Sequence, residues 1–444
     1  MKKLEGKVGL GITVLMSCLF LSQTNVYADV TAEQRQLIET QVDQLDDKEE
    51  SFIPGELIVG LSGNHRIDLK EKSSSNLFGI NARVVEDLTL GTNEKERRNH
   101  NQVLLIQFST ALELSQVIKQ LHKLPEVEYA EPNYVFTSDE VETATVSMEQ
   151  PNHVLKATQI IPNDPYWSQM WGLQKIEMPT AWNKTTGSKN VKVAVIDSGV
   201  DYKHADLAAN VDVSLGYDFV DNDADPQDGK GHGTHVAGTI GAKANNGLGV
   251  PGINWNVTMV PIRVLNNEGK GSSSNIIKGI NWITEKKIPI ANYSISGDNY
   301  SASMETAIKN YPGLFVGSAG NKGASLESNP CYPPALNISN MITVGNSDQQ
   351  DQRSSSSSYS KTKVDLFAPG KSIFSTIPGS YGTKSGTSMA APHVAGSAAL
   401  ALAQNPNLTT SQLKNKILNS VDKKASLSEF CQTGGRLNTA KLLD

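Results

Sequence analysis

The chain reads Gly-Thr-Ser-Met-Ala-Ala-Pro-His-Val-Ala-Gly from Gly386 to Gly396, and the rest of the chain is organised around this stretch. It opens a run from Met389 to Leu402 that is almost all Ala, Val, Gly and Leu, which is typical of a fully buried helix. Ser388 is therefore expected at a helix N-terminus, where backbone N–H groups and the helix dipole favour an oxygen that becomes negative during a reaction. Serine is also a common helix cap, so its meaning depends on other stretches.

Two further stretches supply possible partners for this serine. Residues 191–201 read Val-Lys-Val-Ala-Val-Ile-Asp-Ser-Gly-Val-Asp, which predicts a buried parallel strand with Asp197 at its carboxyl end, where open α/β sheets place their sites. Residues 231–238 read Gly-His-Gly-Thr-His-Val-Ala-Gly and predict a helix that begins at His232. Asp197 could merely cap a turn and His232 could be a structural histidine. Together with Ser388 they offer an acid, a base and a nucleophile.

The three motifs, in the chain order Asp197, His232 and Ser388, resemble those of the subtilisin-like serine proteases, the subtilase family. The resemblance implies a secreted serine endopeptidase that hydrolyses peptide bonds of polypeptide substrates through an acyl-enzyme. It also implies a self-inhibited zymogen, in which the chain's own pro-domain acts as intramolecular inhibitor and folding aid. Two alternatives remain open: a processing protease for one specific peptide precursor, and a non-catalytic binding module.

Composition divides the chain into five expected segments. Lys2, Lys3 and Lys7 precede an apolar run from Val8 to Leu21, and small residues lie before Asp29, which is the pattern of a cleaved secretory signal. The expected segments are a signal peptide (1–28), a polar spacer (29–51), an inhibitory pro-domain (52–136), a linker that contains the maturation site (137–162) and the catalytic domain (163–444).

The predicted fold follows from alternating strand and helix patterns. The pro-domain is expected to be a small α+β ferredoxin-like unit with strands at 55–61, 84–90, 103–108 and 127–131 and a helix at 111–124. The catalytic domain is expected to be α/β, a parallel sheet with helices on both faces. Its predicted strands are 192–196, 259–264, 290–294, 314–318 and 341–344, and its predicted helices include 273–285, 304–310 and 410–420. The serine-rich run 354–358 is expected to form a surface loop.

Overall charge excludes some classes of partner. The chain has 444 residues, 40 Lys and Arg against 46 Asp and Glu, and a net charge of -6, which gives no sign of nucleic-acid binding. No second apolar stretch of membrane-spanning length follows the signal, so we expect no membrane association after maturation. We expect the mature enzyme to be a monomer.

The expected chemistry assigns a role to each polar residue. His232 would take the proton of the Ser388 hydroxyl, and Asp197 would hold the other ring nitrogen. Because His232 must be neutral to accept a proton, activity is expected to fall below about pH 6–7. By resemblance, the Asn321 amide and the Ser388 backbone N–H form the oxyanion hole. His204, His235 and His393 are expected to be structural.

Substrate-binding residues are implied by the resemblance alone. The segment Ser294, Ile295, Ser296 and Gly297 matches the family's strand that pairs with substrate and walls the first specificity pocket. The family usually has glycine at the position of Ser296, so its side chain could narrow the pocket. Lys322 follows Asn321 at a position that is often acidic in subtilisins. We hypothesise that Lys322 weakens cleavage after Lys or Arg and improves acceptance of Glu, although it could be a solvated lysine.

Calcium is the expected structural cofactor. By resemblance its ligands come from Asp206, Asn246, Leu248 and Val250, with Asp164 as a further ligand. Separately, Asp221, Asp223 and Asp225 crowd carboxylates into one loop, which predicts either a second calcium ion or a solvated acidic loop. After removal of the signal only Cys331 and Cys431 remain, and a disulfide between them is as possible as two thiols.

Overall fold

The structure, a computed structural model, describes residues 30–45, 51–63, 65–68, 77–91, 93–138 and 159–444. The predicted signal peptide and most of the predicted linker lie outside these residues. The amino-terminal unit consists of α1 (Ala32–Val42), β1 (Phe52–Leu61), β2 (Ala82–Asp87), α2 (Glu94–Arg97), β3 (Val103–Phe108), α3 (Leu114–Leu121) and β4 (Val127–Ser138). None of the described helices is long and apolar enough to cross a membrane.

The amino-terminal unit is built on an antiparallel sheet in the order β4-β1-β3-β2, which agrees with the predicted ferredoxin-like arrangement. β4 continues past its predicted end and includes Thr137 and Ser138. The segment expected as a polar spacer contains α1, which packs beside α3, and its Ile38 and Val42 are buried in the core of this unit. α1 carries its own cap, since the Thr31 hydroxyl accepts from the Gln34 backbone N–H and Gln34 bonds back to Thr31.

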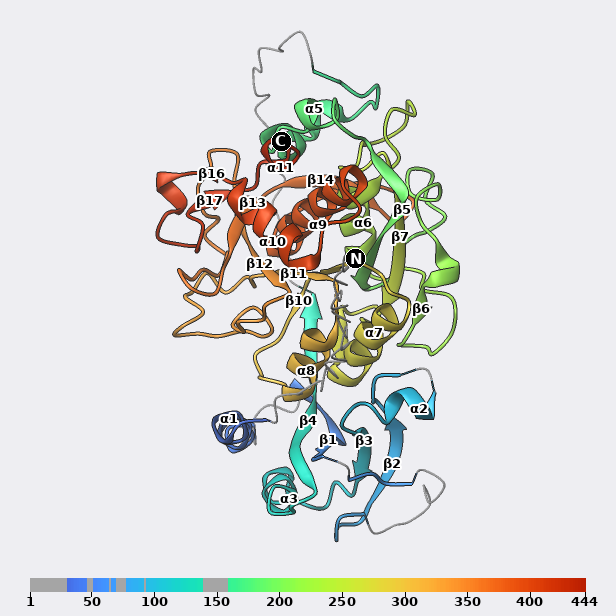
Figure 1. The fold of residues 1–444 in the computed structure, drawn as a ribbon, viewed down its shortest axis with the longest axis vertical. Helices are drawn as coiled ribbons and strands as arrows, with labels where there is room; N and C mark the ends of the chain where they lie inside the picture. Colours follow the sequence, from blue (N-terminus) through green and yellow to red (C-terminus); the bar gives the residue numbers. More distant parts are fainter. Residues whose placement is uncertain (1–29, 46–50, 64, 69–76, 92, 139–158) are drawn as a thin grey trace, which may run out of the picture.

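The rest of the described chain forms a second unit, which we call the catalytic unit after the role that the sequence predicts for it (Figure 1). Its helices are α4 (Trp171–Lys175), α5 (Met178–Ala181), α6 (His232–Gly241), α7 (Ser273–Glu285), α8 (Ala302–Asn310), α9 (Thr387–Gln404), α10 (Thr410–Asn419) and α11 (Thr439–Leu442). Its strands are β5 (Gly187–Asp197), β6 (Tyr217–Asp218), β7 (Asn256–Arg263), β8 (Lys270–Ser272), β9 (Ile290–Tyr293), β10 (Ile295–Ser296), β11 (Leu314–Ser318), β12 (Met341–Ser347), β13 (Leu366–Pro369), β14 (Ile373–Ile377), β15 (Ser380–Lys384), β16 (Asp422–Lys423) and β17 (Gly435–Arg436).

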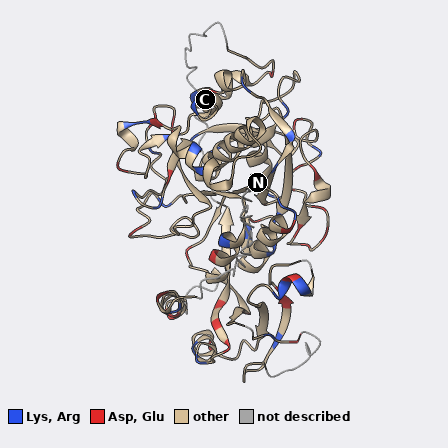
Figure 2. Cartoon of the chain, viewed as in Figure 1, with Lys and Arg blue, Asp and Glu red and all other residues tan. Residues whose placement is uncertain are grey.

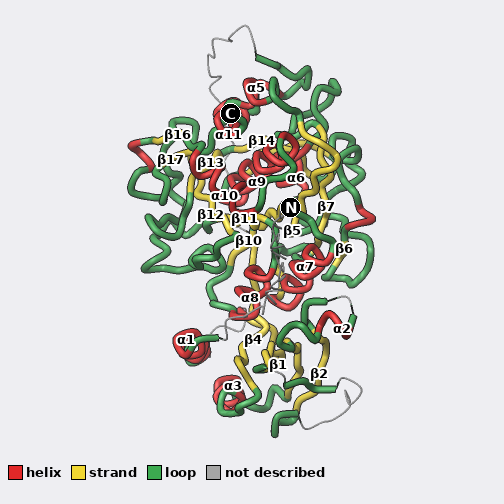
Figure 3. The backbone as a smooth tube through the Cα atoms, in the orientation of Figure 1, coloured by secondary structure: helices red, strands yellow, loops and turns green. Residues whose placement is uncertain are grey.

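A largely parallel sheet in the order β16-β17-β13-β12-β11-β9-β5-β7-β6 forms the centre of this unit. Only the β16–β17 pair at its edge is antiparallel. Side chains of β5 alternate between the two faces, as a strand period of two requires. Val193 and Val195 pack with α6 and α9, whereas Ala194 and Ile196 pack with α7 and α8. Helices therefore cover both faces of the sheet, as expected (Figure 3).

β4 joins the two units. Its apolar side chains belong to the same core as those of α7 and α8, so the two units share a continuous hydrophobic interior. β4 also caps both helices. The Asn133 side-chain oxygen accepts from the Ser274 backbone N–H at 3.0 Å, and the carboxylate of Glu131 accepts from the Ala302 backbone N–H at 2.7 Å. Burial raises the pKa of Glu131, which is fully covered, although these donors favour its charged form.

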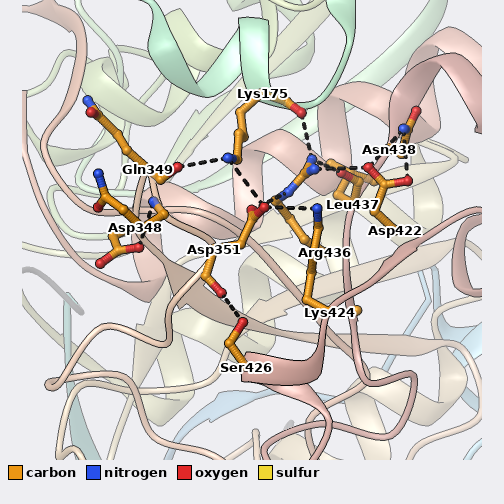
Figure 4. A network of polar contacts seen from close by, with 12 residues as sticks. Lys175, Asp348, Gln349, Asp351, Asp422, Lys424, Ser426, Arg436, Leu437 and Asn438 are labelled. Carbon is orange, nitrogen blue, oxygen red and sulfur yellow. Dashed lines mark hydrogen bonds and ion pairs between the residues drawn. The ribbon is translucent and has the colours of Figure 1, made fainter. Parts of the chain in front are cut away.

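Charges of both signs are interspersed over the catalytic unit (Figure 2), and one buried network ties its carboxyl-terminal strands together (Figure 4). Arg436, only 3% exposed, donates to Asp351 at 2.7 Å and to Asp422 at 2.9 Å. Lys175 and Lys424 also contact Asp351, at 3.3 and 2.9 Å. Burial alone would raise the pKa of Asp351, but Arg436, Lys424 and Lys175 hold it below its ordinary value. The network links α4 to the last strands of the sheet.

We expect Arg436→Met to lower the free energy of unfolding by about 3–5 kcal/mol, because it leaves buried Asp351 and Asp422 without their main partner. Since the pKa of Asp351 is depressed, its contribution is complete above the ordinary carboxyl pKa and is lost as pH falls through the depressed value. Thermal scans of wild type and variant should therefore converge in strong acid. Lys441→Met is the control, because this half-exposed partner of Asp422 contributes at most about 1 kcal/mol. Equal losses from both variants would contradict the role given to Arg436.

Candidate active site

Asp197 and His232 form the fixed half of the site. Asp197 is the last residue of β5, and His232 is the first residue of α6, which begins near the carboxyl ends of the parallel strands. The Nδ1 atom of His232 lies 2.7 Å from Asp197 Oδ1, and both side chains are fully buried. Asp197 also accepts from the Ser198 backbone N–H at 2.7 Å. With its Nδ1 proton held by a carboxylate, the imidazole presents Nε2 for proton transfer.

The start of α6 is fixed by Asp228, a residue that the sequence analysis did not single out. Its carboxylate accepts from the backbone N–H groups of Gly231 at 2.7 Å and Thr234 at 2.9 Å, and from the Ser198 hydroxyl at 2.8 Å. Asp228 therefore ties the first turn of α6 to the residue that follows Asp197. The signal available in the sequence was an aspartate shortly before a glycine-rich helix start, which is a common capping pattern.

Ser388 lies in the first turn of α9, as predicted, and is fully buried. Its hydroxyl donates to the Ser294 carbonyl at 3.1 Å. The Ser388 carbonyl in turn accepts from the Ser294 hydroxyl at 3.1 Å. This second bond has a local cause, since Pro392 stands four residues further along α9 and has no N–H to donate to the Ser388 carbonyl. The serine turn is thus bound to the segment after β9.

Asn321 follows β11 and faces the same helix turn. Its side-chain oxygen accepts from the Thr387 backbone N–H at 3.0 Å, which fixes the orientation of the amide. The Nδ2 atom of Asn321 is buried and has no hydrogen-bond partner in the structure. A buried donor without an acceptor is costly, and it is the arrangement needed to bind an oxygen that becomes negative during a reaction.

The three competing histidines are held by backbone carbonyls. His235 Nε2 lies 2.9 Å from the Ile373 carbonyl, His393 Nδ1 lies 2.8 Å from the Met389 carbonyl, and His204 Nε2 lies 2.9 Å from the Ser380 carbonyl. Burial lowers the pKa of His235 to about 3 and that of His393 to about 4. Both therefore stay neutral near neutral pH, and neither can cause a change of activity there.

β4 of the amino-terminal unit lies between β8 and β10, and we call the space between these two strands the groove. β4 pairs antiparallel with β8 through Val135, Phe136 and Thr137, and antiparallel with β10 through Thr137 and Ser138. It therefore runs as a middle strand between two strands of the catalytic unit. The backbone of Ile295 and Ser296 pairs with β4 at one edge of this groove. That the same backbone binds substrate stays a prediction.

Three further side chains, those of Lys322, Ser296 and Cys331, lie near Asn321 or the glycine before it. A Cβ atom on Gly320 would lie 2.6 Å from the Cys331 sulfur and 3.7 Å from the Ser296 hydroxyl, so these small side chains crowd the residue before Asn321. Lys322 pairs with Asp298 at 2.7 Å, and its contacts to Asn329 and the Pro330 carbonyl are longer, at 3.5 and 3.3 Å. Because both members of the Lys322–Asp298 pair are solvent-exposed, it is a weak tie.

The expected calcium ligands lie close together at one loop. Asp206 is fully buried and accepts from Asn246 Nδ2 and the Val250 backbone N–H, both at 2.9 Å. Asp164 accepts from the Asn245 backbone N–H at 2.7 Å, and its other oxygen is buried without a hydrogen-bond partner. Burial, together with the nearby charge of Asp206, raises the pKa of Asp164. Leu248, whose carbonyl was the remaining expected ligand, has an exposed side chain on the same loop.

The loop that contains Asp221, Asp223 and Asp225 lies beside a positively charged side chain, that of Arg263. Arg263 donates to Asp218 and, at 2.5 Å, to Asp221. Asp225 accepts from the Tyr202 hydroxyl at 2.7 Å, and Asp223 accepts from the Asp225 backbone N–H at 2.9 Å. In the described part of the chain, no three His, Cys, Asp or Glu side chains gather as metal ligands. Charge repulsion alone therefore no longer argues for a calcium ion in this loop.

Cys331 and Cys431 are both buried thiols, and no disulfide joins them. Cys431 contacts the Leu427 carbonyl, and Cys331 donates to the Ala319 carbonyl at 3.4 Å. The sequence left open whether these two cysteines form a disulfide or remain thiols, and in the structure they are thiols.

Comparison with known proteins gives consistent matches over both units. The profile of the Subtilase family matches residues 188–434, and that of the Fervidolysin N-terminal prodomain matches residues 39–133. The thermophilic serine proteinase of Bacillus sp. (strain AK1) is 35% identical over 394 residues, which cover 88% of this chain and 87% of that protein. Thermitase of Thermoactinomyces vulgaris is 39% identical over 285 residues, 63% of this chain and 98% of its own. Subtilisin BL of Lederbergia lenta is 39% identical over 254 residues, 56% of this chain and 90% of its own.

Proposed function

Since this chain belongs to the subtilase family of serine proteases, we propose that it is a secreted endopeptidase whose catalytic triad is Asp197, His232 and Ser388. The amino-terminal unit is its inhibitory pro-domain, which keeps the precursor inactive until it is cut away. The observation that carries this proposal is the passage of β4 between β8 and β10, beside the serine that the triad needs. Its substrates are polypeptides in general, and the proposed oxyanion hole is formed by Asn321 and the Ser388 backbone N–H.

The proposed reaction uses each group in turn. The Ser388 hydroxyl turns from the Ser294 carbonyl to His232, which takes its proton as the oxygen attacks the peptide carbonyl. Asp197 stays charged and stabilises the imidazolium through the 2.7 Å bond to Nδ1. The orphan amide of Asn321 binds the oxygen that becomes negative. His232 then returns the proton to the leaving amine, and water hydrolyses the acyl-enzyme.

The inhibited state explains why the site is covered. The triad residues are fully buried in the precursor, in which β4 pairs with β8 and β10. A cavity of about 520 Å³ lies between part of the pro-domain and α7 and is lined by residues that include Arg97, Lys278 and Trp282. Substrate has access to Ser388 only when β4 leaves the groove.

The test follows the purified precursor by intact mass in calcium-containing buffer, with casein hydrolysis measured in parallel. We expect wild type to lose its amino-terminal region and to gain casein activity over the same period. If the precursor folds, stays whole and remains inactive on casein, a trace of an outside protease is added to remove the amino-terminal unit. Activity that then appears supports a zymogen that needs another enzyme, and a folded protein that stays inactive after this removal contradicts the proposal.

Calcium fits the site at Asp164 and Asp206. Calcium prefers hard oxygen donors. This site offers two buried carboxylates, one with an unpartnered oxygen, together with an amide group and the carbonyls of a loop. We propose that Asp206, Asn246 and Asp164, with the carbonyls of Leu248 and Val250, hold one calcium ion. The ion would tie the segment at Asp164 to the 245–250 loop and would neutralise the facing carboxylates.

Removal of calcium with a chelator is expected to lower the thermal midpoint of the protein. At a calcium concentration about 100 times its dissociation constant, the ion would stabilise the fold by about 2.7 kcal/mol. Asp206→Asn should make the midpoint insensitive to the chelator. Glu268→Gln removes the same charge from an exposed position and should leave the sensitivity unchanged. A chelator effect that persists in Asp206→Asn would place the ion elsewhere.

A further inference from the structure

Helix α1 is fixed to the pro-domain by its apolar face and by the residue before its cap. Ile38 and Val42 are buried in the same hydrophobic core as the strands of the pro-domain, and Leu45, just after the helix, is buried with them. Before the helix start, the Val30 backbone N–H donates to the carboxylate of Glu128 on β4 at 2.6 Å. The pro-domain therefore sets where the first turn of α1 lies.

The side chain of Gln34 makes one bond within α1 and one bond to the catalytic unit. Its oxygen accepts from the Thr31 backbone N–H at 2.8 Å, which completes the capping box of the helix. Its nitrogen donates to the carboxylate of Glu305 on α8 at 3.0 Å. Because the oxygen and nitrogen of an amide share one rigid plane, the bond to Thr31 orients the nitrogen. The capped first turn of α1 thus presents a hydrogen-bond donor to α8.

Glu305 lies in an environment where such a donor has a large effect. This residue is only 9% exposed, and the carboxylate oxygen that accepts from Gln34 also accepts from the hydroxyl of buried Tyr300, at 2.7 Å. The other carboxylate oxygen pairs with Lys309 at 2.6 Å. A carboxylate that is largely removed from water needs donors on its oxygens, since a missing donor leaves the charge poorly solvated. Of these donors, Gln34 is the one that belongs to the pro-domain.

We propose that α1 is a second attachment of the inhibitor, in which Gln34 binds the surface formed by Tyr300 and Glu305 and slows the release of the pro-domain after the maturation cut. The inference rests on the proposed function, because it needs an inhibitory pro-domain. The first attachment is β4, which lies between β8 and β10. Since α1 and β4 share one core, both attachments must open before the pro-domain leaves. The segment expected as a polar spacer is therefore part of the inhibitor.

The variant Gln34→Glu removes this attachment with little effect on α1 itself. Glutamate is a usual residue at this position of a capping box, so its carboxylate still accepts from the Thr31 backbone N–H. The donor to Glu305 is replaced by a second carboxylate, and the two like charges repel each other across the interface. The buried apolar face of α1 is unchanged. We therefore expect a folded pro-domain that is held less tightly.

The first experiment measures, in the purified precursor, the interval between the maturation cut and the appearance of peptide hydrolysis. We expect Gln34→Glu to shorten this interval about tenfold, because a hydrogen bond to a charged group is lost. Gln36→Glu makes the same chemical change on the exposed side of α1 and should behave like wild type. Adding Glu305→Gln to Gln34→Glu places a donor opposite the new carboxylate and should recover most of the wild-type interval. Equal intervals in wild type and Gln34→Glu would overturn the inference.

The second experiment does not depend on catalysis by this protein. An outside protease is used to cut the Ser388→Ala precursor between its two units, and native mass spectrometry follows how long the two fragments stay together. We expect the fragments to separate about tenfold faster when Gln34→Glu is also present, and at an unchanged rate with Gln36→Glu. Separation at the same rate with and without Gln34→Glu would refute the attachment. If Gln34→Glu speeds separation but the freed wild-type catalytic unit hydrolyses no peptide, the attachment stands and the proposed function fails.

Discussion

Ser388→Ala is expected to leave the precursor whole and to lower turnover of peptide substrates by about 10⁶-fold, the loss measured when the nucleophile of subtilisin, a relative, is removed. The physical reason is that the Ser388 hydroxyl contacts the Ser294 carbonyl at 3.1 Å, whereas the other hydroxyl at the start of α9, that of Thr387, is engaged by the Asn321 oxygen and the Gly320 backbone N–H. The measurement combines intact mass of the precursor with hydrolysis of a peptide substrate by enzyme from which the pro-domain has been removed.

A fold control accompanies this variant. A trace of active wild-type enzyme should cut the Ser388→Ala precursor, because the variant lacks only the nucleophile and remains a polypeptide substrate for another enzyme molecule. Ser380→Ala, an exposed serine on β15, should mature and hydrolyse substrate like wild type. If Ser388→Ala matured alone at the wild-type rate, the assignment of the nucleophile would be wrong.

Asn321→Leu is expected to lower kcat by about 10²–10³-fold, the cost of losing one such donor in subtilisin, with little change in KM. The structure gives the reason: the Asn321 oxygen is held by the Thr387 backbone N–H, so its Nδ2 donors are aimed before substrate arrives. Leucine has a similar volume and no donor. Steady-state kinetics of the mature variant on a peptide substrate measures both parameters.

The split between kcat and KM separates this role from a structural one. A donor used only when the carbonyl oxygen becomes negative stabilises the transition state and not the bound substrate. Asn407→Leu makes the same replacement in an exposed loop between α9 and α10 and should change neither parameter. A rise in KM with kcat unchanged would instead assign Asn321 to ground-state binding.

The elements that carry the site could be predicted because their patterns are local. Each of three elements is indicated by one continuous stretch of sequence: the buried helix after Ser388, the strand before Asp197 and the helix that begins at His232. α7 was predicted with the bounds that the structure has, Ser273–Glu285, because its apolar residues recur at helical spacing.

Features that depend on distant partners could not be predicted. β4 extends beyond Phe136 because β8 and β10, more than 130 residues away, pair with its last residues. The serine run 354–358, expected at the surface, has Ser357 and Ser358 fully buried, because Ser358 donates its backbone N–H to the Gly320 carbonyl. The polar composition of α1 likewise concealed its docking on α3. Short polar segments carry no periodicity that would reveal such partners.

Because β4, α7 and α8 share one hydrophobic core, the ability of the catalytic unit to fold depends on whether the pro-domain is still present. While the pro-domain is present, the apolar faces of α7 and α8 are formed against it, and this chain can fold with every segment of its core in place. Once the pro-domain is lost, a molecule that unfolds lacks part of the surface on which its native form was assembled. We therefore expect the mature enzyme to be kinetically stable: it unfolds slowly and does not refold efficiently. Its stability is then described by its half-life at a given temperature and not by an unfolding equilibrium.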